Sequence, residues 1–242
     1  MIQKTQIQIN DIPHTITTHI ERRNSIRASI TKTGINIRVP KHLNRFQREI
    51  EVKKFTNWAI ERIKAKPQKI FTPKTYNHGD IIRTHSKIYK LHIENRDSIK
   101  NFAKIKDSYV ILKISNNHDE QTKQKYISKQ LQKLLAKEHL PELESHIHRL
   151  NALHINKPIN KISYKYTISR WGACNHTNKE INLSTRLLLA PLPILEYVII
   201  HELAHLIEPN HSRRFWNIVK SIDPRYKSKK KWLNDNGDSL NL

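Results

Sequence analysis

Residues 201 to 205 read His201-Glu202-Leu203-Ala204-His205, a spacing at which side chains can bind a metal ion and activate water. On an α-helix, positions four apart lie on one face, so His201 and His205 can place two imidazoles on one ion. Glu202 is offset by about 100° and reaches the edge of the same site, where a carboxylate can take a proton from water. The pattern therefore predicts zinc-assisted hydrolysis, with two histidine ligands and Glu202 as the general base.

A third imidazole follows at His211, six residues after the second. On a continuous helix it would lie about 9 Å further along the axis. Pro209 removes a backbone N–H and disfavours helix at the residue before it, so we expect a turn that brings His211 back toward the other two. Asn210 is then placed to cap a new helix beginning near Ser212. Glu208 is the competing third ligand, since a carboxylate takes that role in other zinc peptidases.

The alternative for these histidines is a helix with solvated or core imidazoles and no metal. Nearly every residue from 195 to 200 is apolar, so the helix is expected to be buried on most sides, where bare imidazoles need partners. The spacing also fits the metzincin pattern, but that pattern needs glycine at the position of Glu208 and a later methionine turn. The single methionine is Met1, so a metzincin is excluded.

The chain carries 44 Lys and Arg residues against 21 Asp and Glu, a formal net charge of +23. Such an excess favours polyanionic partners, namely nucleic acid, nucleotides or acidic proteins. A composition rich in Lys, Asn and Ile, with only 4 glycines, explains the same excess without a binding role. The densest cluster, residues 227–231, reads Lys-Ser-Lys-Lys-Lys and fits a phosphate-binding patch or a solvated helix face equally well.

Cysteine content and hydropathy indicate the compartment. The single cysteine, Cys174, permits no intrachain disulfide, and we expect it to be a small buried residue rather than a reactive thiol. The first residues lack the apolar run of a signal peptide, and the longest apolar stretch, residues 187–200, is too short to span a bilayer. We therefore expect a soluble cytoplasmic protein with no membrane partner, and the oligomeric state stays open.

The elements that position these residues indicate an α+β chain in two parts. Residues 1–115 are expected to form a β-rich N-terminal region, with a hairpin about Thr33-Gly34 and one helix at about residues 44–64. A connector is expected over residues 65–78. The apolar stripe expected on the helix consists of Phe46, Ile50, Phe55, Trp58 or Ala59, and Ile63.

Residues 116–242 are expected to form a zincin-like, mostly helical catalytic domain with a small sheet. Residues 119–152 show helical spacing, with Pro141 kinking or dividing the helix. Residues 161–169 alternate as a half-buried strand, and residues 181–184 form a second strand. The metal helix follows, with Pro193 in its first turn, and two short helices divided at Asp223-Pro224 end the chain. Either strand could pair with an extended substrate or simply cover the helix.

Several segments in this order resemble the YgjP-like metallopeptidase domain, a family related to the SprT-like zinc peptidases. They are Arg170-Trp171-Gly172-Ala173-Cys174, residues 183–187, Ala190-Pro191, residues 197–205, Asn210-His211-Ser212 and Phe215-Trp216. The similarity is strongest over residues 160–235, and the β-rich leader also looks like that of the family. The resemblance implies a zincin-like domain with one zinc ion per chain on His201, His205 and His211, and Glu202 as the general base.

The chain departs from the family at positions that do not touch the metal residues. Ala173 stands where the family usually has serine, so a hydroxyl at this position is not essential to this protein. Ser184-Thr185 stand where the family often has Asn-Trp, which weakens any role assigned to that strand. Arg170 and Tyr197 are candidates for contacts with the substrate or the transition state. The respective alternatives are a structural ion pair and core packing.

These observations predict a zinc-dependent metallohydrolase, and foremost a peptidase acting on a peptide or protein substrate. One alternative is a hydrolase of nucleotide phosphoanhydride bonds that uses the same activated water. Another is a DNA-associated zinc protease held to nucleic acid by its basic surface. A nucleic-acid-binding protein with a purely structural zinc is disfavoured, because such sites are normally closed by four protein ligands and three are found here.

Overall fold

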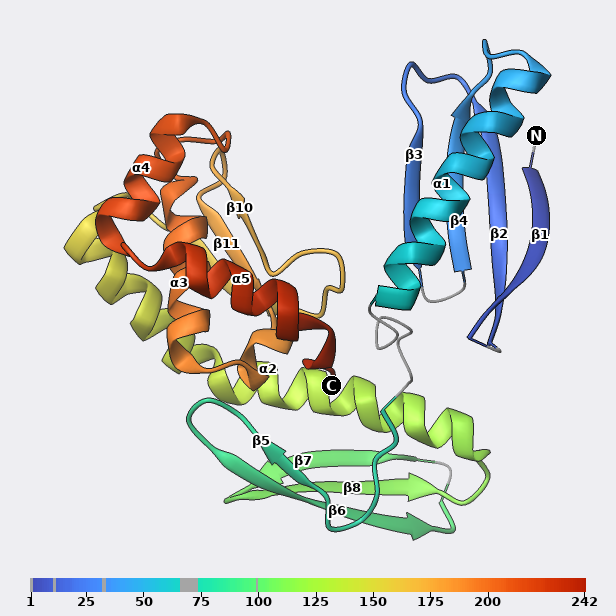
Figure 1. The fold of residues 1–242 in the computed structure, drawn as a ribbon. Coiled ribbons are helices and arrows are strands. Elements are labelled where there is room, and N and C mark those ends of the chain that lie inside the picture. The colour runs from blue at the N-terminus through green and yellow to red at the C-terminus, as the bar shows by residue number, and fades with distance from the viewer. Residues whose placement is uncertain (1, 11, 32–33, 66–73, 99) are drawn as a thin grey trace. The chain divides into compact units, whose positions relative to one another are not determined.

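The computed structural model describes residues 2–10, 12–31, 34–65, 74–98 and 100–242. The chain divides into two compact units, Met1–Pro73 and Lys74–Leu242 (Figure 1). Buried apolar side chains form one core in the first unit and two in the second. Strands and helices both contribute throughout, so the predicted α+β class is confirmed. No helix in the described part of the chain is both long enough and apolar enough to cross a membrane.

The first unit is a four-stranded sheet with one helix. Its strands β1 (Ile2–Ile9), β2 (Ile12–Glu21), β3 (Arg27–Thr31) and β4 (Gly34–Pro40) take the order β1-β2-β4-β3, with β2 and β4 parallel. β3 and β4 form the predicted antiparallel hairpin, although its turn at residues 32–33 lies outside the described residues. Gly34 has φ +134°, and a Cβ there would lie 2.0 Å from the Thr15 carbonyl oxygen, so only glycine fits.

Helix α1 (Arg45–Ala65) is present as predicted, but its predicted stripe is wrong in the N-terminal half. Phe46 and Ile50 are 71% and 50% exposed, whereas Ala59 and Ile63 are fully buried. The α1 side chains that pack in the core of this unit begin at Val52, so Phe46 and Ile50 lie outside that core. The predicted connector falls largely on residues 66–73, which lie outside the described residues.

The second unit begins with a sheet that repeats the strand order of the first. Its strands β5 (Ile81–Arg83), β6 (Ile88–Arg96), β7 (Phe102–Lys106) and β8 (Tyr109–Ser115) take the order β5-β6-β8-β7, again with the inner pair parallel. A helix follows in each case. The apolar pattern of the sequence does not reveal this shared strand order, because the order depends on pairing between strands that are distant in the sequence.

Helix α2 (Glu120–His154) is the longest element and joins the two cores of the second unit. It continues through Pro141, which excludes a division at this residue and leaves a kink as the other predicted alternative. Packing along both halves holds the proline turn helical. Its first half packs on the β5–β8 sheet and its second half on the C-terminal helices (Figure 1). The predicted domain boundary after residue 115 lies inside this unit, between β8 and α2.

The remaining elements surround the predicted metal residues. A three-stranded sheet has the order β10-β11-β9, from β9 (Lys161–Lys165), β10 (Gly172–Asn175) and β11 (Glu180–Ser184). After the 3-10 helix η2 (Thr185–Leu189) come α3 (Leu192–Ala204), α4 (Arg213–Ile222), α5 (Tyr226–Asn236) and η3 (Gly237–Ser239). The strand predicted over residues 161–169 ends at residue 165, and β10 was not predicted.

Candidate metal centre and active site

Helix α3 carries the first two histidines and the carboxylate. It begins at Leu192 with Pro193 in its first turn, as predicted, and most of its side chains are buried. The helix ends at Ala204, with His205 as the capping residue, so the break comes earlier than the Glu208-Pro209 position predicted from the sequence. His201 and His205 nevertheless stay one turn apart, with ring centroids 5.0 Å apart.

The turn after α3 folds His211 back toward α3, as predicted. The residue that caps the next helix is Ser212 and not Asn210, since the Ser212 hydroxyl accepts a hydrogen bond from the Phe215 N–H at 3.3 Å. The three imidazoles converge, and their ligand nitrogens lie within 4.8 Å of one another. The Nε2 atoms of His201 and His211 are 2.9 Å apart.

The orientation of His205 fits metal binding. Its Nδ1 lies 3.1 Å from the backbone carbonyl oxygen of Glu208, which can only accept, so Nδ1 carries the proton and the Nε2 lone pair is left for a metal ion. Among the described residues, the Glu208 carboxylate is not part of the cluster. Glu208 therefore orients a ligand through its backbone, and the structure does not support it as the competing third ligand.

Phe215 holds all three imidazoles in place. Its side chain is fully buried, and its ring centroid lies 4.8 Å from that of His201, 4.5 Å from that of His205 and 4.7 Å from that of His211. Trp216 stacks on the His211 ring at 5.8 Å. The sequence pattern alone did not assign these supporting roles, because they depend on the angle at which α4 returns across α3.

The electrostatics of the cluster suit a divalent cation. Burial, together with the smaller effects of the neighbouring His205, His211 and Lys230, lowers the pKa of His201 to about 3. Burial also lowers the pKa of His205. Neutral imidazoles offer lone pairs rather than protons, and the buried Nδ1 of His201 has no hydrogen-bond partner among the described residues. Three imidazole nitrogens that lie within 4.8 Å of one another are a donor set that fits zinc.

Glu202 lies beside this cluster and is only 4% exposed. Burial raises the pKa of Glu202 to about 8, while the charge of Arg170 and a hydrogen bond from the Cys174 backbone N–H act in the opposite direction. The carboxylate packs directly on β10, because a Cβ added to Gly172 would lie 2.4 Å from Glu202 Oε1. Gly172 was not predicted as a site residue, although it lies in one of the segments that carry the family resemblance and is one of only 4 glycines in the chain.

A cavity of about 480 Å³ opens over the histidines and Glu202. Arg170 and Tyr197, the two predicted contact residues, both line it. Arg170 is exposed at the rim, whereas Tyr197 is 5% exposed, its ring lies 6.2 Å from that of His201, and burial raises its pKa to about 12. Tyr197 is thus both a core residue and part of the cavity wall.

The lysine cluster of residues 227–231 divides between the two interpretations made from the sequence. Lys230 lines the cavity, and its amino group lies 4.8 Å over the Trp216 ring. Lys229 pairs with Asp223 at 2.9 Å and Lys231 with its helix neighbour Asp235 at 2.6 Å, so their charges are locally compensated. One lysine of the cluster therefore adds positive charge to the candidate site.

The strand arrangement decides which strand borders the cavity. β11 is paired on both sides, with β10 and with β9, so the predicted substrate pairing with residues 181–184 is excluded. β10 is an edge of this sheet, and Gly172, Ala173 and Cys174 line the cavity. Cys174 is partly buried rather than buried as predicted, and this burial raises the pKa of its thiol to about 12, which disfavours the thiolate that a reactive thiol needs.

Comparison with known proteins gives one curated relative and two solved structures. The chain is 32% identical over 77 residues to a protein of Escherichia coli (strain K12) named UTP pyrophosphatase, across 31% of this chain and 45% of that protein. The chain thus matches less than half the length of this relative. Two metallopeptidase zymogens also match 38% of the chain, namely Pyrococcus abyssi abylysin (21% identity, 93% of that chain, TM-score 0.36) and Methanocaldococcus jannaschii jannalysin (20%, 94%, 0.35). Both TM-scores are too low to support an argument.

The family assignment is stronger. A family model described as YgjP-like, metallopeptidase domain matches residues 24–236, which include every element of the candidate site. The match and the histidine cluster together support a metal-dependent hydrolase that uses a divalent metal. The chain belongs to the YgjP-like metallopeptidase domain family.

Proposed function

We propose that this chain is a zinc-dependent hydrolase in which His201, His205 and His211 hold the ion and Glu202 is the general base. The observation that carries the proposal is the convergence of three imidazoles within 4.8 Å. When bound, zinc supplies a Lewis acid that polarises a substrate oxygen and makes water more acidic.

Glu202 is placed to move the proton that hydrolysis requires. It takes a proton from the attacking water and returns it to the leaving group, so the carboxylate ends each cycle as it began. The Cys174 N–H and the Gly172 backbone hold the carboxylate on one side, and Arg170 favours its ionised form. The role of Glu202 follows from its position beside the imidazoles, in a cavity open to a substrate.

The charge around the cavity favours an anionic substrate, and we infer a nucleoside triphosphate. Arg170 and Lys230 both line the cavity and can neutralise phosphate oxygens, and Trp171 offers an aromatic surface beside them. The curated relative named UTP pyrophosphatase supports the same class. Water then attacks phosphorus, the bond to the bridging oxygen breaks, and diphosphate leaves with a nucleoside monophosphate as the other product. The nucleotide thus becomes the first candidate substrate, whereas the sequence had favoured a peptide.

A peptide substrate is the second candidate, and the edge strand β10 is the observation that favours it. An extended peptide could add to that edge and bring its carbonyl group to the metal. The description of the family as a metallopeptidase domain points the same way. Both candidate reactions use the same ion and the same base, so only assays with the two kinds of substrate can distinguish them.

The test compares wild type with Glu202→Gln, an isosteric change that removes the base. We expect zinc content to be unchanged and turnover of UTP to fall by about 10²- to 10⁴-fold. Glu208→Gln is the matched control, because its contact with His205 uses the backbone, and it should behave as wild type.

Two results would contradict the proposal. Wild-type turnover in Glu202→Gln refutes the general base, whichever substrate is used. Hydrolysis of a peptide mixture but of no nucleoside triphosphate, lost in the same variant, keeps the base and replaces the nucleotide by a peptide.

A further inference from the structure

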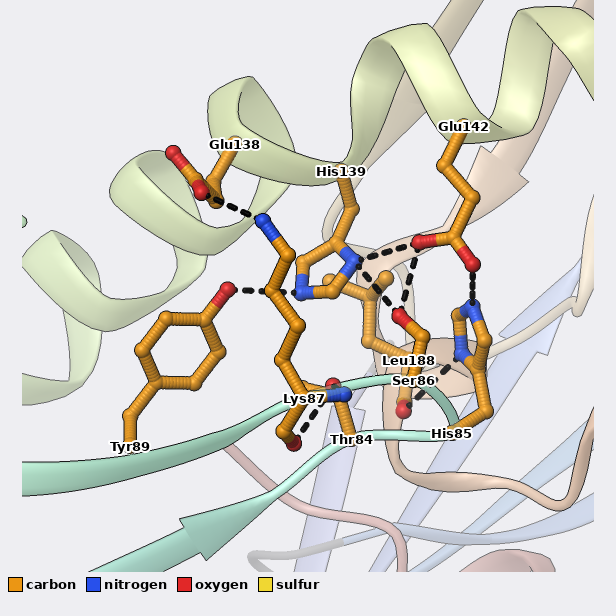
Figure 2. Close-up of polar contacts among 9 residues, drawn as sticks. All are labelled: Thr84, His85, Ser86, Lys87, Tyr89, Glu138, His139, Glu142 and Leu188. Carbon is orange, nitrogen blue, oxygen red and sulfur yellow. Dashed lines mark hydrogen bonds and ion pairs between the residues drawn. The ribbon is translucent and has the colours of Figure 1, made fainter. Parts of the chain in front are cut away.

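A second cluster of possible metal ligands lies outside the candidate active site. His85, in the turn between β5 and β6, approaches His139 and Glu142 of α2, and the ligand atoms of the three lie within 4.8 Å of one another (Figure 2). None of the three lines the cavity over His201. The cluster is therefore independent of the chemistry proposed above.

His139 occupies an unusual position on α2. The buried residues of this helix recur about every fourth position, and they are Ile127, Leu131, Leu135, His139, Leu143, Ile147 and Leu150. His139 is the one polar side chain in that series, and it is 1% exposed. Burying an imidazole is costly unless both nitrogens are satisfied. Its Nε2 lies 3.1 Å from the Tyr89 hydroxyl and its Nδ1 lies 3.0 Å from Glu142 Oε2.

His85 is held so that its Nε2 faces a carboxylate oxygen of Glu142 without a proton to donate to it. Its Nδ1 lies 3.3 Å from the Leu188 carbonyl oxygen, which can only accept, so Nδ1 carries the proton of a neutral ring. The buried Nε2 then directs a lone pair toward Glu142 Oε1, which is 3.3 Å away. It makes no hydrogen bond of good geometry with any described residue. Two acceptors thus face each other across this short gap.

Protonation is a poor way to resolve this conflict. Burial lowers the pKa of His85; Glu142 acts against that shift, and His139 reinforces it. Burial works to raise the pKa of Glu142, but hydrogen bonds from His139 and Ser86 hold it below its ordinary value. A neutral imidazole therefore faces an ionised carboxylate. A cation bound between them satisfies both.

The distances match a metal ion of the zinc class. Ligand atoms at about 2.0–2.2 Å from a tetrahedral ion are about 3.3 Å apart. Glu142 approaches His85 Nε2 through Oε1 at 3.3 Å and His139 Nδ1 through Oε2 at 3.0 Å, and the ligand atoms of the three residues all lie within 4.8 Å of one another. The far side of each imidazole is also supported, by the Leu188 carbonyl for His85 and by the Tyr89 hydroxyl for His139 (Figure 2). The Ser86 hydroxyl donates to Glu142 Oε2 at 2.8 Å and lies 3.5 Å from His139 Nδ1. Such outer contacts orient metal ligands.

We propose that His85, His139 and Glu142 form a second site for a divalent transition-metal ion such as zinc. Glu142 keeps 31% of its side chain exposed and Ser86 is exposed, so an ion can reach the site from solvent. Binding moves the His139 proton from Nδ1 to Nε2, where the Tyr89 oxygen accepts it, and the ring stays neutral. The ion joins the β5–β6 turn to α2, and through Leu188 to the segment that leads into α3.

The test is a cobalt(II) titration of the metal-free full-length chain, followed by the visible absorption of the bound ion and by metal content. Wild type should bind about two ions per chain, and Glu142→Gln about one, with affinity at the second site reduced by at least about 100-fold. Glu138→Gln is the matched control, because Glu138 lies one turn earlier on α2 and pairs with Lys87, outside the cluster (Figure 2). It should bind as wild type does.

A second arm separates the two sites. In a His205→Ala background one ion should remain, and cobalt or zinc should raise the melting temperature; adding Glu142→Gln should abolish both effects. Two ions at unchanged affinity in Glu142→Gln would overturn the proposal. So would a wild-type chain that binds one ion and loses it on His205→Ala alone. Neither result bears on Glu202, so the proposed hydrolase activity is tested independently, by the Glu202→Gln variant.

Discussion

The contact between Gly172 and Glu202 gives the sharpest test of how the fold positions the proposed base. Replacing Gly172 with alanine adds one methyl carbon to β10 and changes no metal ligand. That carbon would lie 2.4 Å from Glu202 Oε1 and 2.7 Å from both Cδ and Cγ of the same side chain. The substitution therefore acts on the carboxylate through space.

The size of the effect follows from these distances. Ordinary contacts of a Cβ begin at 3.4 Å, so the carboxylate must move by about 1 Å. Glu202 is 4% exposed and has little free space in which to do so. A misplacement of about 1 Å in a catalytic group can reduce the rate about 10²-fold, which corresponds to about 2.7 kcal/mol of barrier. We expect kcat of Gly172→Ala to fall by that factor.

The assay measures kcat and KM for UTP hydrolysis together with zinc content and the melting temperature. Zinc content should match wild type, because the three imidazoles are not touched. Glu202→Gln serves as the reference for complete loss of the base. Adding Gly172→Ala to Glu202→Gln should change the residual rate little, since both changes act on the same group.

Two outcomes would refute this reasoning. A wild-type kcat in Gly172→Ala would show that β10 does not hold the carboxylate in its working position. A stoichiometric loss of zinc with the loss of activity would show that the substitution disturbs the metal centre and not the base.

Two further predictions concern residues around the site. Arg186 is 2% exposed, donates to the backbone carbonyls of Leu240 and Ile168 at 2.7 Å and 3.2 Å, and lies 4.2 Å over the Trp171 ring. Because Arg186→Met removes these hydrogen bonds, it should lower the free energy of unfolding by about 3 kcal/mol, measured by urea titration. A loss well below about 1 kcal/mol would contradict this prediction. Because partial burial raises the pKa of Cys174 to about 12, alkylation at pH 8 should be about 10³-fold slower in the folded chain than in urea, and equal rates would contradict the raised pKa.

The local parts of the candidate site could be predicted from the sequence. Helical periodicity alone places His201, Glu202 and His205 on neighbouring faces, because the spacing of a helix is set by its backbone. The return of His211 was predicted from the proline in the turn. The details of that turn were not, since Ser212 and not Asn210 caps α4, and α3 ends at Ala204.

The parts that depend on long-range contacts could not be predicted. Strand patterns indicated β-structure, but not the shared order of the two four-stranded sheets, because parallel pairing joins strands separated by another strand. β10 escaped prediction because it is short and its residues are only partly buried. The exposed first turns of α1 show the same limit, since an apolar residue is buried only where a partner exists.

The sequence by itself determined the metal-binding motif, the third histidine and the proposed base, because their geometry depends on a few consecutive residues. Tertiary structure alone decided what surrounds them: Phe215 against the three rings, Gly172 against Glu202, and Lys230 at the cavity. It also brought His85 to His139, which is 54 residues away in the sequence. No local pattern encodes such a contact, because it forms only when a turn and a helix pack against the same core.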